Sequence, residues 1–163
     1  MLVKSNSVPN FLFETPQKKE YKLSNLISSI KTPKGNFISP HIYGLFNCKP
    51  TELYNDETYL VMEKIYGNSL DDSSLTKEEG INNINKYLNQ IFEIQNLLYD
   101  KGFILNDLNP RNIIITKDNK AKFIDFDDMY TIYTGVSIPL SDRLSKEKLK
   151  KNLIDDYLDW YEK

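Results

Sequence analysis

Three oxygen-bearing side chains, Asp107, Asn112 and Asp125, stand at a spacing that could serve metal-assisted chemistry. Asp107 and Asn112 lie in one predicted loop, and Asp125 follows the second of two short predicted strands, 113–116 and 121–124. The Lys-Asp-Asn-Lys run at 117–120 is typical of a turn between the strands. Such a hairpin brings the three side chains together, where oxygen atoms can bind a hard cation and a carboxylate can accept a proton.

This order of motifs resembles the catalytic core of the protein-kinase-like superfamily, whose D-x-x-x-x-N loop and D-F-G motif flank such a hairpin. The resemblance implies an α+β fold with a reduced N-lobe and a minimal, mainly helical C-lobe, and ATP and Mg²⁺ as cofactors. By the same resemblance, Asp107 would accept the proton of the attacking hydroxyl, while Asn112 and Asp125 would hold Mg²⁺ against the nucleotide phosphates. The alternative is that Asp and Asn are merely common in turns.

The stretch from Tyr59 to Leu70 is predicted to be a strand that runs into an extended connector, and it resembles the kinase hinge. The resemblance implies that main-chain atoms of Glu63 and Ile65 bind the adenine edge. Met62 would guard the pocket, and Ile114 would pack beneath the adenine. An ordinary buried strand is compatible with the same pattern.

The amino-terminal part resembles the rest of a kinase N-lobe only in pieces, and it contains no G-x-G-x-x-G motif. Leu2-Val3-Lys4 resembles the strand whose lysine contacts the α- and β-phosphates, and residues 17–30 form a predicted helix in the place of the family's αC helix. Glu20 would then pair with Lys4, although a solvated lysine and a surface glutamate are the simpler alternative. The apolar stripe predicted for this helix is Tyr21, Leu23, Leu26, Ile27 and Ile30.

Two further helices are predicted in the carboxy-terminal part. A capping box from Thr76 to Glu79 opens a long helix that ends at Gly102, with one apolar face formed by Ile81, Ile84, Leu88, Ile91 and Leu98. Residues 129–139 are predicted to be irregular. Ser141-Asp142 is predicted to cap a last helix with Leu149, Leu153, Tyr157 and Trp160 on one face. We expect an N-lobe over residues 1–63 and a C-lobe over residues 64–163.

Composition narrows the function classes. The 163 residues are 40% hydrophobic and 27% charged, which is typical of a globular protein, and no apolar run approaches the roughly 18 residues that span a membrane. The start lacks the apolar segment of a secretory signal, and the single cysteine, Cys48, fits a reducing compartment. We therefore expect a cytoplasmic protein. A net charge of −2 argues against nucleic acid as a partner.

Departures from the family motifs leave three functions open. Leu105-Asn106-Asp107 replaces H-R-D, Asn109 replaces the lysine that steadies the γ-phosphate in serine/threonine kinases, and D-F-G becomes D-F-D at Asp127, which we expect at the surface. The N-D-L loop resembles that of a group of small kinases. The truncated length resembles minimal kinases of giant viruses and secreted bacterial effectors, for which a host cytoplasm is expected. The I-D-F-D-D run resembles aminoglycoside and choline phosphotransferases. The chain could be a serine/threonine kinase with a protein substrate, an impaired kinase mimic with a partner protein, or a small-molecule kinase, and the oligomeric state stays open.

Overall fold

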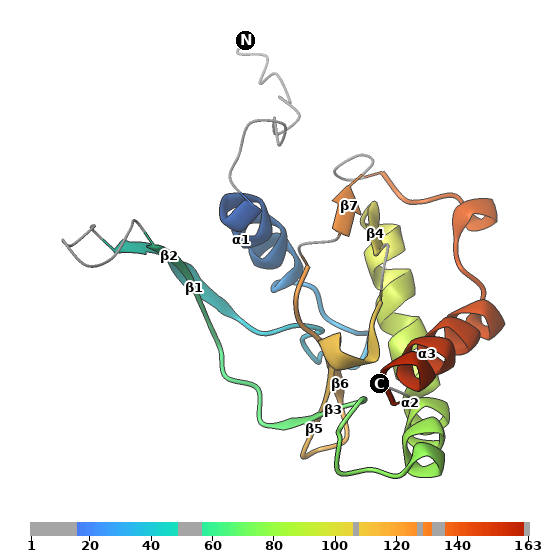
Figure 1. The fold of residues 1–163 in the computed structure, drawn as a ribbon. Coiled ribbons are helices and arrows are strands. Elements are labelled where there is room, and N and C mark those ends of the chain that lie inside the picture. The colour runs from blue at the N-terminus through green and yellow to red at the C-terminus, as the bar shows by residue number, and fades with distance from the viewer. Residues whose placement is uncertain (1–15, 49–56, 106–107, 127–128, 132–135, 162–163) are drawn as a thin grey trace.

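The computed structural model describes residues 16–48, 57–105, 108–126, 129–131 and 136–161, which adopt an α+β fold (Figure 1). The helices are α1 (Pro16–Ile27), α2 (Lys77–Asp100) and α3 (Lys146–Tyr161), with 3-10 turns η2 (Pro110–Asn112) and η3 (Leu140–Asp142). The strands are β1 (Ile42–Cys48), β2 (Glu57–Met62), β3 (Gly67–Ser69), β4 (Phe103–Leu105), β5 (Ile113–Thr116), β6 (Ala121–Phe123) and β7 (Met129–Thr131). In Figure 1, α1 and the β1–β2 hairpin lie on one side of the β3-β5-β6 sheet, and α2 and α3 lie on the other.

The strands form small antiparallel sheets in the orders β1-β2, β3-β5-β6 and β4-β7. The predicted hairpin at 113–124 is confirmed as β5 and β6, with Asn119 in the left-handed conformation at the turn (φ 60°). The prediction that residues 129–139 are irregular is wrong for β7, which pairs with β4. That pairing joins segments far apart in the sequence, so no local turn signal announces it.

A helix in the predicted segment 17–30 is confirmed, but α1 ends at Ile27, so that Ile30 lies beyond it. Its buried face differs in part from the expected stripe, of which Tyr21 is only half-buried. Leu23, Ile27 and Ile30 are buried as predicted, whereas Leu26 is 46% exposed. The small side chain of Ser24 is buried instead. Helix α1 contacts both strands of the β1–β2 hairpin, so the docking surface of the hairpin, rather than hydrophobicity alone, determines which side of the helix is covered.

Helix α2 begins with the predicted capping box. The Thr76 hydroxyl accepts from the Glu79 amide at 3.3 Å, and the Thr76 amide donates to the Glu79 carboxylate at 2.7 Å. The Thr76 hydroxyl also donates to this carboxylate at 2.8 Å, and the two donations from Thr76, chiefly that of its amide, lower the pKa of Glu79. Of the predicted face, Ile81 is partly buried and packs against the core, while the other members, Ile84, Leu88, Ile91 and Leu98, are buried. Gly102 follows the helix with a positive φ of 81°, which a residue without Cβ adopts at little cost.

Helix α3 packs on α2 through Leu149, Leu153 and Tyr157, as predicted, but two other predictions about it are wrong. Trp160 is 43% exposed. Ser141 lies in η3, and it is the Ser145 hydroxyl that accepts from the Lys148 amide at the start of the helix. Both segments offer a serine before an apolar repeat, and the sequence alone did not distinguish them.

One cluster of buried side chains runs through the described part of the chain. It joins Leu23 and Ile27 of α1 to Ile84 and Ile91 of α2 and to Phe123 of β6. The cluster thus spans both of the segments expected as lobes, and the division at residue 63 stays a prediction. None of the helices among the described residues is long and apolar enough to cross a membrane.

Candidate active site

A cavity of about 300 Å³ lies where α1, the end of β2 and the β5–β6 hairpin meet. Six of the sequence-predicted site residues line it: Glu20, Met62, Glu63, Ile65, Ile114 and Asp125. Pro40 and Ile124 complete the lining. The apolar side chains form walls suited to a flat ring. The lining also contains three carboxylates, and besides Glu63 these belong to Glu20 and Asp125, which have the chemistry to attract a cation.

Pro40 and Ile124 were not predicted as site residues. Ile124 lies between β6 and Asp125, so its position beside the predicted metal ligand was the signal that could have found it. Pro40 lies just before β1 and has no motif around it, so only the folded chain reveals its place in the cavity.

The two predicted metal ligands lie at neighbouring ends of the β5–β6 hairpin. Ile113 pairs with Phe123, and the Ile124 amide donates to the Asn112 carbonyl at 2.9 Å. This bond ties the residue before Asp125 to Asn112 itself. Of the two predicted metal ligands, only Asp125 lines the cavity. Asn112 is partly buried and is not part of the lining.

Asp125 adopts a left-handed backbone conformation with φ 64°, which few residues other than glycine adopt. Aspartate tolerates this region better than most side chains because its short polar group can bond locally. Such conformations carry strain and concentrate at functional sites. The bend turns the chain directly after β6, before the buried Phe126 enters the core.

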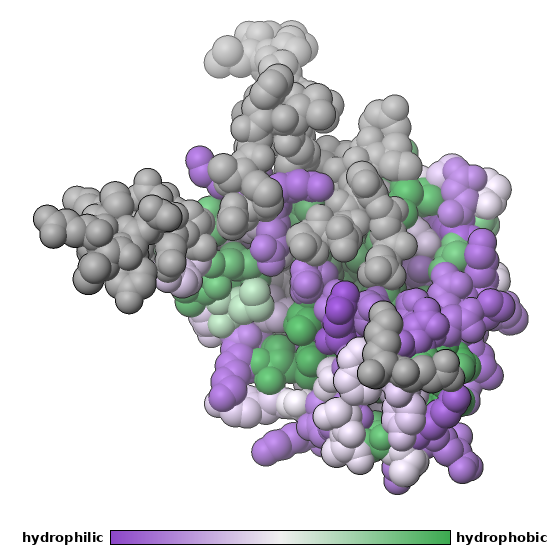
Figure 2. All heavy atoms as spheres, viewed as in Figure 1, coloured by the Kyte–Doolittle hydropathy of each residue, from purple (hydrophilic) through white to green (hydrophobic). Residues whose placement is uncertain are grey.

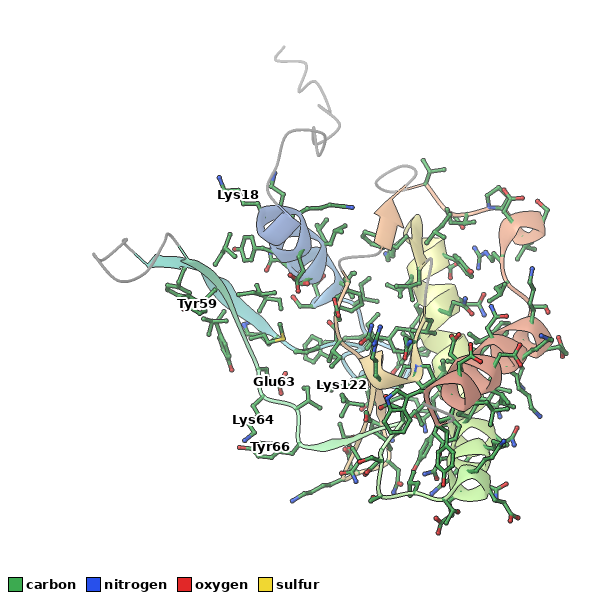
Figure 3. All side chains as sticks on the ribbon, viewed as in Figure 1. Lys18, Tyr59, Glu63, Lys64, Tyr66 and Lys122 are labelled. Carbon is green, nitrogen blue, oxygen red and sulfur yellow. The ribbon has the colours of Figure 1, made fainter. Side chains whose placement is uncertain are left out.

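The linker of residues 63–66 joins β2 to β3 and passes along the cavity (Figure 3). The Glu63 amide donates to the His41 carbonyl at 2.8 Å, and its carboxylate accepts from the His41 amide at 3.0 Å. Lys122 Nζ lies 3.8 Å from the same carboxylate. Glu63 is thus anchored both to His41, just before β1, and to Lys122 of β6. Because its amide already has a partner, its carbonyl is the main-chain group better suited to a ligand.

Gly67 follows the linker as the first residue of β3, where the chain approaches β5 closely. A Cβ at this position would collide with the main-chain carbonyl of Ile115 and crowd Ile114. Gly67 pairs with Thr116 in the sheet. The glycine therefore fixes the linker against the hairpin that carries Ile114 and Asp125.

Asn109 has a structural role in the loop before β5. Its side-chain oxygen accepts from the Arg111 amide at 3.1 Å and caps η2, which begins with Pro110. A lysine could not accept this bond, since an ammonium group only donates. The cap shapes the backbone that leads into Asn112.

Three residues singled out in the sequence, Lys4, Asp107 and Asp127, lie outside the described residues. The segments on either side of Asp107 are described: Leu105 ends β4, and Leu108 follows. Both leucines pack against the core. The ends of the loop that carries Asp107 are therefore anchored.

The donor chemistry of the site fits Mg²⁺ with a nucleotide. In such sites Mg²⁺ takes one or two protein carboxylates, and phosphate oxygens and water complete its octahedron. Asp125 with the amide oxygen of Asn112 is a ligand set of this kind. Over the described residues, no group of three or more His, Cys, Asp or Glu side chains could hold a metal ion by itself.

Comparison with known proteins identifies protein kinases as relatives of this chain. A probable serine/threonine-protein kinase of Clostridium acetobutylicum is 37% identical over 71 residues, which make up 42% of this chain and 10% of that protein. Sperm motility kinases 3A and 3B of Mus musculus are each 29% identical over 117 residues, or 69% of this chain and 22% of theirs. The chain thus spans less than a quarter of the length of these curated relatives. The protein kinase domain family matches residues 12–142, and by that match the chain belongs to this family.

Proposed function

We propose that the chain is an ATP-dependent phosphotransferase of the serine/threonine protein kinase type, which transfers phosphate to a hydroxyl of a protein substrate. The observation that carries this proposal is the cavity that gathers Met62, Glu63, Ile65, Ile114 and Asp125 from three separate segments. The relative in Clostridium acetobutylicum is a probable serine/threonine-protein kinase, which supports the same class of acceptor.

In the proposed mechanism, Met62, Ile65 and Ile114 bind the base through apolar contact, and the Glu63 carbonyl accepts a hydrogen bond from it. Asp125 and Asn112 position the cation. When bound there, ATP would supply the phosphoryl group, and Mg²⁺ would neutralise the charge that develops on it. Asp107 orients the acceptor hydroxyl and takes up its proton, so that the protein contributes mainly positioning and charge.

Substitution Asp125→Asn tests the proposed metal site. Asparagine tolerates the left-handed backbone at least as well as aspartate, so the hairpin should keep its shape. The neutral amide is a weaker ligand for a hard cation. We expect the increase in Tm on adding Mg²⁺ to an ATP-saturated sample to disappear, while the Tm of the unliganded protein changes little.

The matched control is Asp118→Asn, in the turn of the same hairpin and outside the cavity lining. That variant should keep the full Mg²⁺-dependent shift. A saturating ligand at a hundred times its Kd stabilises by about 2.7 kcal/mol, which a thermal titration resolves easily. An unchanged shift in Asp125→Asn would show that Asp125 does not bind the cation.

Substitution of Lys4 tests whether the amino-terminal segment holds the phosphates. We expect Lys4→Met to weaken ATP binding and Glu20→Gln to weaken it less, since Glu20 lines the cavity and would act by orienting the lysine. Isothermal titration with Mg²⁺-ATP measures both. If both variants bind like the wild type, neither side chain contributes to phosphate binding.

The second candidate function is a kinase mimic that binds a partner protein without transferring phosphate. The observation in its favour is Asn109, whose side chain is engaged in capping η2 where serine/threonine kinases carry a phosphate-steadying lysine. Nucleotide binding without transfer to any acceptor protein, measured with γ-labelled ATP, would favour the mimic.

A further inference from the structure

A second and larger cavity, of about 470 Å³, is also lined by the linker of residues 63–66. We call it the lysine groove. Its walls are the linker, the loop at 35–37 and the turn of the β5–β6 hairpin. Four lysines line it: Lys64, Lys117, Lys120 and Lys122. Figure 3 shows Lys64 and Tyr66 together on the linker and Lys122 beside Glu63.

The charge of the groove is opposite to that of the chain. The whole protein carries a net charge of −2, yet the four groove lysines face only two carboxylates in the lining, Glu63 and Asp118. Lys122 is paired with Glu63 at 3.8 Å. The Thr116 hydroxyl donates to Asp118 at 2.6 Å and lowers the pKa of that carboxyl, with smaller contributions from Lys120 and Lys122.

The other lysines retain capacity to bind an anion. Among the residues that the structure describes, Lys64, Lys117 and Lys120 form no salt bridge, and Lys64 and Lys117 are exposed. The groove therefore combines positive charge with three ammonium groups that form no ion pair with any described residue.

Two exposed aromatic side chains, Tyr66 and Phe37, also line the lysine groove. Tyr66 is 64% exposed and Phe37 is 45% exposed. Lys64 Nζ lies 5.1 Å from the centre of the Tyr66 ring, and Lys31 Nζ lies 4.4 Å from that of Phe37. Each ring thus carries a cation over its face and offers apolar surface to a ligand. Figure 2 likewise shows hydrophobic side chains reaching the surface near the β1–β2 hairpin and the linker, in contrast to the hydrophilic side chains over α3.

We propose that the lysine groove binds an acidic, extended segment of another protein. The lysines come from opposite walls, the linker and the hairpin, which suits carboxylates spread along a chain. A single phosphate would instead require several donors that converge on one point. Tyr66 and Phe37 would contact the apolar side chains between the carboxylates, as aromatic residues do in protein interfaces.

Binding in the groove would also reach the nucleotide cavity. Glu63 and Ile65 line both cavities, so the linker is a wall that they share. An acidic residue that enters the groove competes with Glu63 for Lys122 and so changes one of the contacts that anchor the linker. This coupling, unlike the docking itself, rests on the proposed nucleotide function.

The docking proposal is tested by fluorescence anisotropy with the full chain and a fluorescein-labelled octaglutamate probe, without nucleotide. The salt concentration is about 0.15 M, at which exposed charges are screened beyond roughly 8 Å. The test variant is Lys64→Glu/Lys117→Glu. The matched control is Lys101→Glu/Lys148→Glu, which reverses two exposed lysines away from the groove and changes the net charge equally. We expect the Kd of the probe to rise about tenfold or more in the test variant and less than about twofold in the control.

An equal loss of affinity in both variants would overturn the proposal, because net charge alone would then explain binding. Unchanged affinity in both variants, relative to the wild type, would overturn it as well. Displacement of the probe by inorganic phosphate at the same concentration of charge would overturn the peptide assignment in favour of a simple anion site. Thermal melts of each variant confirm that it is folded.

The coupling is tested by the increase in Tm with Mg²⁺-ATP, recorded with and without saturating octaglutamate. We expect the two increases to differ, and equal increases would overturn the coupling. The titration without probe reports nucleotide binding on its own, so a failure of the proposed function is distinguished from a failure of the docking site.

Discussion

Replacing Asp107 by alanine should lower the rate of phosphate transfer about a hundred- to ten-thousand-fold, the contribution that a positioned general base typically makes. The affinity for Mg²⁺-ATP should change little, because we assign the binding of the cation to Asn112 and Asp125 and the binding of the adenine to other residues, among them Ile114. The loss should therefore fall on kcat, with the Kd of the nucleotide preserved. Single-turnover transfer and isothermal titration measure the two quantities separately.

The scaffold around Asp107 supports this separation. Leu105 and Leu108, on either side of it, pack against the core, and Asn109 caps the turn that follows. Described residues on both sides thus anchor the ends of the loop, and we expect the Asp107→Ala variant to remain folded. Asp159→Ala, an exposed aspartate of α3, is the matched control and should transfer phosphate at the wild-type rate. Full activity in the Asp107 variant would exclude Asp107 as the base.

Replacing Gly80 by alanine should destabilise the protein, although alanine in a helix is normally about 1 kcal/mol better than glycine. A Cβ on Gly80 would collide with the ring and hydroxyl of Tyr157. Tyr157 is fully buried between α2 and α3, and its hydroxyl donates to the Thr76 carbonyl at 3.3 Å. The ring cannot swing into solvent, so the collision must be relieved by moving the helices apart.

Such overpacking typically costs about 1–3 kcal/mol. For a chain of this size the Tm falls by roughly 2–4 °C per kcal/mol, which differential scanning calorimetry measures directly. The control is Asn82→Ala, an exposed position on the same helix, which should raise the Tm slightly. In the double variant Gly80→Ala/Tyr157→Leu the collision is removed, and the two substitutions should cost less together than the sum of their separate costs. Strict additivity would contradict the contact.

The same Tyr157 is held in its protonated form over a wider range of pH. Burial is the main cause that raises the pKa of its phenol, and the nearby Tyr161 and carboxylates, including those of Asp71 and Glu79, act in the same direction. A neutral phenol at this position can keep donating to the Thr76 carbonyl. The packing at Gly80 and the hydrogen bond at Thr76 therefore depend on one another at the start of α2.

Much of the candidate site was predictable because its signals are local. The capping box from Thr76 to Glu79 and the β-branched run followed by a turn at 113–120 each specify an element within a few residues. The resemblance to the kinase motifs then predicted residues that the fold places around one cavity: Glu20, Met62, Glu63, Ile65, Ile114 and Asp125. Their roles in binding and catalysis stay predictions.

The sequence by itself determined the family, the α+β class and the start and end of the main helix and hairpin, since helix caps, turns and strand patterns depend on neighbours along the chain. Only the tertiary structure decided which face of α1 is buried, that β7 pairs with β4, and that Gly80 must lack a side chain beneath Tyr157. It also decided that lysines from two distant segments line one groove. These outcomes depend on contacts between segments far apart in the sequence, where the shape of the partner surface, and not local hydrophobicity, determines which side chains are covered.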